Sequence, residues 1–235
     1  MNYLFIILGI VVVIILYFVY SYLFPSKNKV ANKNYLANGV KDVSFEKLEN
    51  PSSEKYSLEV WIYANNLNGT DTATRSTDGA FTAPGGISAN VSGCIFQVMT
   101  GTSSCYNLDL FNDATLAFYN SGTTPVVTVP NFPLQRWVYV VISVDNKLVD
   151  IYLDGKLIRS VKSSSTITAP TAQSIFKFGT GDIYIAGMNR TATVTDSNTV
   201  FKNYMQGNAG LKLPGYSISL DFLKNSSVAQ NIPIM

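Results

Sequence analysis

The chain has 235 residues, 47% of them hydrophobic and 14% charged, and a net charge of +2 at pH 7. Its 17 basic residues are scattered, so no basic stripe suggests a nucleic-acid partner. Histidine is absent, which excludes a Ser-His-Asp triad and a histidine zinc site, and two cysteines are too few for a four-cysteine metal site. The length fits one large domain with an appendage.

The chain begins with an apolar segment, residues 2–24, that contains neither charge nor proline. As a helix, residues 3–24 would be about 33 Å long, which matches the core of a lipid bilayer. A cleaved signal peptide would need a basic start, a shorter apolar run and small residues before the cut, and the sequence has none of these. We therefore expect residues 1–25 to be a retained transmembrane anchor whose partner is the bilayer.

The flanks of this segment predict its orientation. Lys27, Lys29 and Lys33 follow it, while only the amino terminus precedes it. Positive residues favour the cytosolic side, so the large domain is expected there. Four glycosylation sequons favour the opposite side, although an Asn-, Ser- and Thr-rich chain also produces sequons by chance. They begin at Asn68, Asn90, Asn189 and Asn225.

Residues 26–44 are polar and rich in Asn and Lys, which predicts a tether between the anchor and the domain. With few apolar residues, this segment should not fold alone. Fully extended, it would reach roughly 60 Å. The domain itself is expected to span residues 45–235 and to fold without the membrane.

From residue 45 onward, short runs of β-branched and aromatic residues alternate with clusters of Gly, Asn, Asp, Ser and Pro. No stretch has a sustained helical period. Strands are predicted over residues 56–63, 94–99, 105–111, 114–119, 125–129, 137–144, 148–153, 156–161, 174–178, 182–187 and 216–223. Residues 64–93 form a long loop-like insertion of the kind that carries binding surfaces. The pattern predicts an all-β sandwich or barrel.

Asp154 and Gly155 separate two of these strands. A two-residue Asp-Gly loop supplies the positive φ angles of a type I′ hairpin, so Asp154 is interpreted mainly as a turn residue. A calcium or sugar contact at the rim of the domain is the alternative.

Cys94 and Cys105 flank what looks like a hairpin. If its turn is centred between Met99 and Thr100, the two cysteines lie opposite each other and can form a disulfide, provided that they are close enough. A reducing cytosol argues against the bond, whereas an assembly site with its own thiol oxidation would permit it. The sequence leaves both states open.

Four segments together resemble laminin-G-like and concanavalin A-like lectin/glucanase domains. They are EVWIY at 59–63, RWVYVVISVD at 136–145, VDIYLDGKLI at 149–158 and IYIAG at 183–187. The resemblance covers roughly residues 45–235 and implies a jelly roll of two curved antiparallel sheets. Residues 216–232 look like the closing strand and short final helix of such domains.

Glucanases of this superfamily carry alternate acids on one strand, as E-x-D-x-x-E or E-x-D-x-E, and no such cluster exists here. Of the four glutamates, only Glu59 lies in a convincing strand, followed on the same face by Trp61 and Tyr63. We therefore expect no enzymatic activity and assign no catalytic residue or cofactor.

Lectins of this superfamily hold calcium and sugar at one rim. The weak candidates for such a calcium site are Asp109, Asp113 and Asp182. The alternative for residues 107–119 is a strand, an Asn-Asp turn and a second strand. No glycan-binding residue can be assigned from the resemblance.

Two functions remain open at this point. The first is a non-enzymatic, single-pass membrane protein that contacts other structural proteins, because such an anchored sandwich resembles minor capsid proteins of large icosahedral DNA viruses. It would link the internal membrane of a virion to the capsid shell. The second is a membrane-anchored lectin-like protein that binds glycans.

Overall fold

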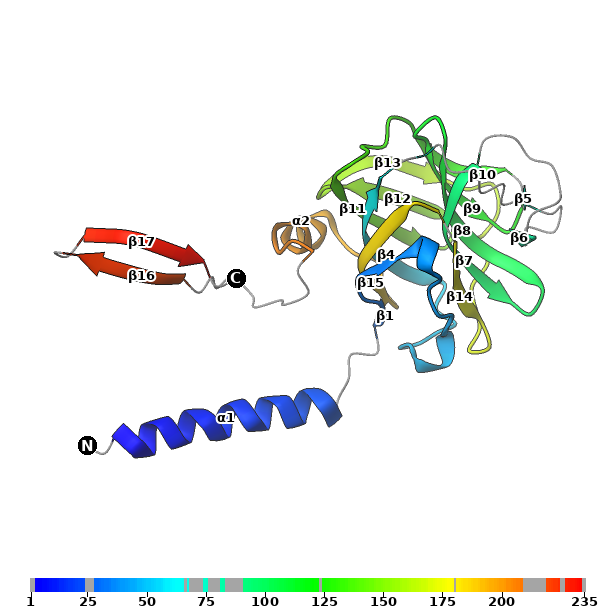
Figure 1. Cartoon of the computed structure of the whole chain (residues 1–235). Coiled ribbons are helices and arrows are strands. Elements are labelled where there is room, and N and C mark those ends of the chain that lie inside the picture. Colours follow the sequence, from blue (N-terminus) through cyan, green and yellow to red (C-terminus); the bar gives the residue numbers. More distant parts are fainter. Residues whose placement is uncertain are drawn as a thin grey trace.

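The computed structural model describes residues 3–23, 28–65, 67, 74–75, 81–82, 91–122, 124–179, 181–208, 219–224 and 227–233. Two antiparallel sheets packed face to face form its centre (Figure 1). Sheet A has the strand order β1-β15-β4-β11-β12-β13, and β2 also pairs with β15. Its strands are β1 Lys29–Ala31, β2 Asn34–Tyr35, β4 Lys55–Ala64, β11 Trp137–Asp145, β12 Leu148–Leu153, β13 Lys156–Lys162 and β15 Ile183–Thr191.

Sheet B has the order β10-β9-β8-β7-β14-β3. Its strands are β3 Val43–Ser44, β7 Val91–Thr100, β8 Ser103–Phe111, β9 Leu116–Asn120, β10 Pro125–Val129 and β14 Ile175–Phe178. The predicted strands between residues 56 and 187 all lie within or overlap these observed strands. The all-β two-sheet sandwich expected from the sequence is therefore confirmed.

Alternation along the strands builds the core between the sheets. In β4, the side chains of Tyr56, Leu58, Val60 and Ile62 are buried in the main hydrophobic cluster, as the alternating pattern predicted. Tyr56 stacks on Tyr106 of β8 with ring centroids 5.1 Å apart. The odd-numbered residues of β4 therefore point to the opposite, outer face of sheet A.

Arg190 of β15 is fully buried beside this core and joins sheet A to the loop that precedes β4. Its guanidinium donates hydrogen bonds to the backbone carbonyl oxygens of Glu49, Asn50 and Pro51. The rings of Phe45 and Tyr56 each lie 5.3 Å from it. Backbone oxygens and aromatic faces thus replace the water that the cation loses on burial.

The predicted tether is wrong, because residues 28–44 belong to the sandwich. β1 and β2 pair with β15, the 3₁₀ helix η1 (Leu36–Asn38) follows them, and β3 pairs with β14. Val30 and Ala31 are buried, and Leu36 is fully buried in the core. The backbone hydrogen bonds of this polar segment are made with strands that lie far away in the sequence. Its local composition therefore does not reveal that it forms strands. A second 3₁₀ helix, η2 (Phe45–Lys47), leads to β4.

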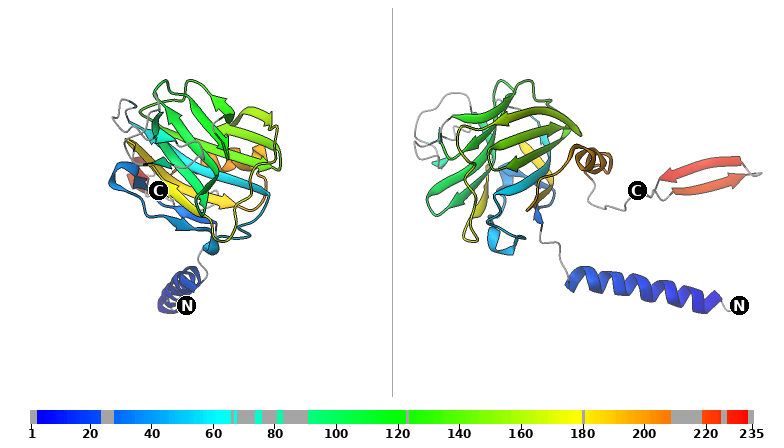
Figure 2. Two further views of the ribbon diagram at one scale, coloured as in Figure 1. Left: turned by 90° about the vertical axis from the view of Figure 1, so that its right-hand side faces the viewer. Right: turned by 180° about the vertical axis from the view of Figure 1, so that it is seen from behind.

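The N-terminal segment forms α1, Tyr3–Leu23, and lies outside the sandwich (Figures 1 and 2). Among the residues that the structure describes, none of the helices combines the length and the apolar character needed to cross a lipid bilayer. The helix is therefore confirmed, and its transmembrane character is not.

Three further regions, which contain α2, the β16–β17 pair and the β5–β6 pair, depart from the sequence-based expectations. Helix α2, Ser197–Met205, was missed, and it packs on the outer face of sheet A through the buried Val200. At the C-terminus, β16 (Ser219–Lys224) pairs with β17 (Ser227–Pro233), so the expected final helix is wrong. The two-stranded β5 (Thr74–Arg75) and β6 (Phe81–Thr82) lie in the predicted insertion, most of which falls outside the described residues.

Candidate binding site

Four aromatic residues lie in a row across the outer face of sheet A. Tyr35, Tyr184, Tyr63 and Trp137 are successive cross-strand partners on β2, β15, β4 and β11. Ring centroids along this aromatic row are 4.3 Å, 6.1 Å and 5.6 Å apart. All four side chains are partly exposed, and the Nζ atom of Lys33 lies 5.7 Å above the Trp137 ring. The row offers solvent a continuous aromatic surface.

The next rung of sheet A carries a second aromatic group. Trp61 pairs with Tyr139 of β11, and their ring centroids are 5.0 Å apart. Tyr204 of α2 stacks on Trp61 from above, at 5.8 Å. Helix α2 thus covers this second aromatic group, whereas the four rings of the aromatic row stay partly exposed.

Glu59 lies one rung further along β4 and is only 6% exposed. Its Oε2 atom accepts a hydrogen bond of 2.8 Å from the Tyr139 hydroxyl. The Asn203 amide of α2 donates to both carboxylate oxygens, at 3.2 and 3.3 Å. Burial raises the pKa of Tyr139 far above its usual value, and Glu59 raises it further, so the phenol keeps its proton as donor.

Asp196 begins α2 and fixes its position over the sheet. Its carboxylate accepts hydrogen bonds from the backbone N–H groups of Asn198 and Thr199, at 2.9 and 3.1 Å, and from the Thr199 hydroxyl at 2.7 Å. These bonds lower the pKa of Asp196, mainly through Thr199. An Asp N-cap of this kind satisfies the free N–H groups of the first turn.

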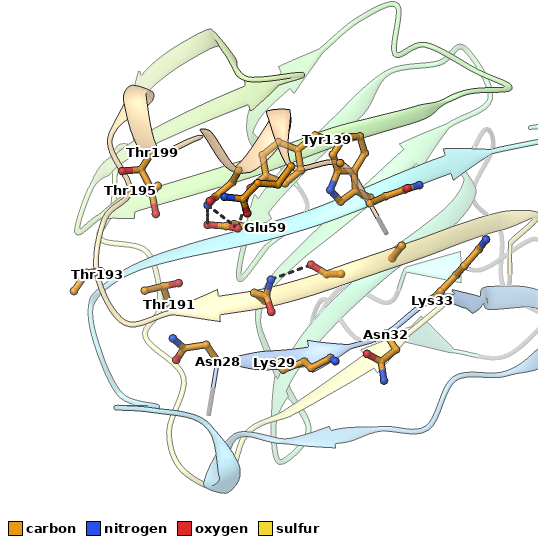
Figure 3. A pocket seen from close by; sticks show the side chains of 18 of the residues that line it. Asn28, Lys29, Asn32, Lys33, Glu59, Tyr139, Thr191, Thr193, Thr195 and Thr199 are labelled. Atoms are coloured by element: carbon orange, nitrogen blue, oxygen red, sulfur yellow. Dashed lines mark hydrogen bonds between the residues drawn. The ribbon is translucent and has the colours of Figure 1, made fainter. Parts of the chain in front are cut away.

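A cleft of about 1180 Å³ opens between α2, the β1 edge of sheet A and Tyr17 of α1. Asn28, Lys29, Asn32 and Lys33 follow its β1 side, whereas Glu59 and Tyr139 lie beneath α2 (Figure 3). The remaining wall is rich in hydroxyl and amide groups, contributed by Asn189, Thr191, Thr193, Thr195, Thr199, Asn203, Gln206 and Asn208. Through Trp61 and Lys33 the cleft adjoins the aromatic row.

Asp154 and Gly155 form the turn between β12 and β13, with φ angles of 48° and 80°. The Asp154 carboxylate also accepts a hydrogen bond from the Tyr139 backbone N–H at 2.9 Å, and it forms an ion pair with Arg136 at 2.7 Å. Both of its oxygens therefore serve the sandwich itself.

The three calcium candidates lie in different surroundings. Asp109 is buried on β8 and accepts from the Asn107 amide at 2.7 Å. Asp113 accepts from the Thr115 backbone N–H in the β8–β9 turn. Asp182 accepts from the Tyr35 hydroxyl at 3.0 Å, and this bond raises the pKa of Tyr35. Within the described ranges, no three acidic, Cys or His side chains gather to hold a metal ion.

Cys94 and Cys105 are both buried and form no disulfide with each other. The hairpin turns at Gly101–Thr102, so Thr100 pairs with Ser103 and Cys94 pairs with Asp109. The observed register of the hairpin therefore differs from the one considered from the sequence, and the two cysteines do not face each other. Thr100 Oγ1 lies 3.2 Å from the Cys105 sulfur.

Glu59, Trp61 and Tyr63 were predicted to share one face of a strand, but no binding role was predicted for them. Tyr35 was missed, and Lys33 was considered only as a signal of membrane orientation, because residues 26–44 were interpreted as a tether. Helix α2, Ser197–Met205, was missed as well. One local signal was available for α2, since Asp196 is followed by a short segment compatible with a capped helix.

The described fold is that of lectin-like β-sandwiches, and the comparison with protein families agrees with it. The chain belongs to the concanavalin A-like lectin/glucanases superfamily, because a laminin G-type profile of that superfamily matches residues 38–191. No curated protein sequence matches the chain significantly.

Solved structures similar to the chain include receptor-binding domains of botulinum neurotoxin. The serotype D ligand-binding domain in complex with N-acetylneuraminic acid has a TM-score of 0.52 and 14% identity, over 76% of this chain and 43% of that one. The receptor-binding domain of botulinum neurotoxin D has the same TM-score and identity, over 75% and 44%. The chain thus spans less than half of these structures, and at this identity the likeness concerns the fold.

Proposed function

We propose that the chain is a non-catalytic carbohydrate-binding protein whose ligand lies on the outer face of sheet A. The observation that carries this proposal is the aromatic row Tyr35-Tyr184-Tyr63-Trp137 beside a polar cleft. Sugar rings have apolar C–H faces that pack on aromatic rings, and hydroxyl groups that need donors and acceptors at the margin. The cleft volume of about 1180 Å³ exceeds the usual range for small ligands, so an oligosaccharide fits.

The charges in the cleft favour a sugar with an anionic group. Both carboxylates of the lining are engaged, since Glu59 is held by Tyr139 and Asn203, and Asp196 caps α2. Lys29 and Lys33 are exposed on the β1 side, and neither forms an ion pair with another described residue. The free charges facing the cleft are therefore positive.

The hydrogen bonds that hold the Glu59 and Asp196 carboxylates also argue against hydrolysis of a bound sugar. Most glycosidases place two carboxyl groups on either side of the scissile bond, one to donate a proton and one to act as nucleophile or base, whereas sialidases use a tyrosine nucleophile. In the described lining, Glu59 is largely covered by its donors and Asp196 holds the backbone of α2. We therefore propose binding without turnover.

A glycan array with the full chain, with and without calcium, tests this proposal. The acidic sugar to test first is N-acetylneuraminic acid, which the similar serotype D toxin domain was solved with. Tyr63→Ala should weaken binding by about tenfold or more, whereas Leu148→Ala, an exposed apolar control paired with Asp145 at the opposite end of β11 from Trp137, should leave it unchanged. Absence of any glycan binding, or equal effects of both variants, would contradict the proposal.

We also propose that residues 3–24 anchor the chain in a bilayer. The support is the sequence, in which residues 2–24 contain no charged residue while Lys27, Lys29 and Lys33 follow. Alkaline extraction of membranes should leave the full chain in the pellet and release a chain without residues 1–27. Recovery of the full chain in the supernatant would overturn the anchor.

The alternative function is structural: a minor capsid protein that links a virion's internal membrane to its shell through protein contacts. It rests on the anchored arrangement inferred from the sequence. Co-purification of the chain with virions, together with a blank glycan array, would favour this alternative over the lectin.

A further inference from the structure

The first ring of the aromatic row carries a negative group. The Tyr35 hydroxyl donates a hydrogen bond of 3.0 Å to the Asp182 carboxylate. The Asn65 amide donates to both oxygens of the same carboxylate, at 3.1 and 3.5 Å. Asp182 is half-buried and Asn65 is exposed, so a ligand can reach both. Because a carboxylate has acceptor positions for about four hydrogen bonds, Asp182 can accept from a further donor.

The last ring of the row carries a positive group. The Nζ atom of Lys33 lies 5.7 Å from the centroid of the Trp137 ring, and the Lys33 side chain is exposed. Lys33 forms no ion pair with another residue that the structure describes. Arg136, which precedes Trp137, is paired with Asp154 at 2.7 Å. A cation–π contact at an exposed site is weak, so a ligand carboxylate can compete for the Lys33 ammonium.

The aromatic row therefore has opposite charges at its two ends. Its rings lie on four adjacent strands, which places the first and the last roughly 14 Å apart at the usual spacing of strands. This is longer than the screening length of about 8 Å in physiological salt. Each charged end consequently acts on the part of a ligand that lies next to it.

We propose that the aromatic row selects oligosaccharides with a single acidic sugar at one terminus and binds them in one orientation. The acidic sugar lies against Trp137 with its carboxylate on Lys33, and hydroxyl groups of the neutral sugars that follow donate to Asp182. A chain with an acid on every sugar is disfavoured, because it would place a second carboxylate beside Asp182. This inference rests on the proposed carbohydrate site and names the class of sugar that the site selects.

Binding titrations of the full chain with three probes test this inference. Lactose is neutral, sialyllactose adds one terminal N-acetylneuraminic acid to it, and a linear trimer of N-acetylneuraminic acid carries an acid on every sugar. Sialyllactose should bind about fivefold more tightly than lactose, because an exposed ion pair contributes up to roughly that factor. It should also bind more tightly than the trimer.

Charge variants with matched controls complete the test. Lys33→Met should reduce the affinity for sialyllactose to that for lactose and leave lactose binding unchanged. Lys147→Met, the same change at an exposed lysine of the β11–β12 turn, should alter neither. Asp182→Asn should strengthen binding of the trimer by about threefold, whereas Asp113→Asn, in the β8–β9 turn of sheet B, should not.

The outcomes separate this inference from the proposed function. A chain that binds none of the three glycans has no carbohydrate site, and the inference fails with it. If lactose and sialyllactose bind equally, or the trimer binds as tightly as sialyllactose, the ends of the row do not select by charge. The same holds if Lys33→Met weakens binding of lactose and sialyllactose by one common factor. In these cases the inference is wrong and the carbohydrate site stands.

Discussion

At the scale of single residues, Asp154 holds the β12–β13 turn against β11. It combines a left-handed backbone with an acceptor for the Tyr139 N–H and an ion pair to Arg136. Asp154→Ala should lower the free energy of unfolding by about 1–2 kcal/mol, since a partly buried N–H loses its acceptor. Asp154→Asn keeps an oxygen and tolerates the backbone, so its loss should stay below about 1 kcal/mol, because Arg136 is exposed.

Urea unfolding of the three proteins measures these differences. If Asp154→Asn lowered the free energy of unfolding as much as Asp154→Ala, the contribution of Asp154 to stability would come mainly from the ion pair and not from the backbone contact. Asp154 lies outside the lining of the cleft and reaches Tyr139 only through its backbone, so both variants should weaken glycan binding less than Tyr63→Ala does.

The two thiols give a second prediction at this scale. Burial raises the pKa of Cys105, and the neighbouring Thr100 lowers it only in part. At mildly alkaline pH the native protein should therefore react slowly with an alkylating reagent. After unfolding without reductant, mass spectrometry should show a gain of two alkyl groups. An unreduced, unfolded protein that takes up none would prove a disulfide.

At the scale of elements, α2 depends on the charge of Asp196. Its pKa in the folded protein lies below the ordinary value of 3.8. A lowered folded pKa means that the carboxylate stabilises the fold fully above pH 3.8 and loses this effect as pH falls through the folded value. The melting temperature of Asp196→Ala should thus be lower than that of the wild type at pH 7, and the difference should vanish in strong acid.

Thermal melts of both proteins between pH 2 and pH 7 check this expectation. Because Asn203 and Tyr204 lie on α2, Asp196→Ala should also weaken glycan binding at neutral pH. A pH-independent difference in melting temperature would mean that Asp196 acts through packing and not through its charge.

Strands were predictable from the sequence where local alternation decides them. Residues 125–129 and 148–153 were predicted with the observed bounds, because each run of β-branched residues ends at a turn signal. The strands in segment 28–44 were not predictable, because its few apolar residues gain their partners only when the segment pairs with β15 and β14. Strand formation there is a property of the tertiary structure.

The candidate site was harder to predict for the same reason. Trp61 and Tyr63 are visible as one face of a strand, but the aromatic row requires the register of four strands that are distant in sequence. The buried state of Glu59 depends on α2, which lies more than 130 residues away. A single sequence contains no local signal for either arrangement.

At the scale of the whole molecule, the segment 28–44 decides where the folding unit begins. It contributes the edge of sheet A beside β15, the edge of sheet B beside β14, and the fully buried Leu36. Only residues 24–28 then separate α1 from β1. We therefore predict that a chain starting at residue 45 is not the independent domain that the sequence suggested.

Two truncations test this boundary. A chain that starts at residue 28 retains every strand of both sheets and should unfold in one cooperative transition in urea. A chain that starts at residue 45 lacks β1, β2, η1 and β3. Loss of Leu36 alone should cost about 2–5 kcal/mol, and the exposed edge of β15 adds to this, against a total stability of about 5–15 kcal/mol for a typical domain.

The shorter chain should therefore aggregate or unfold without a cooperative transition. Leu36→Ala in the chain that starts at residue 28 is the matched control, and it should keep the cooperative transition at a lower urea concentration. Equal stability of the two truncated chains would show that residues 28–44 only lie along the sandwich, and would restore the tether as the correct description of that segment.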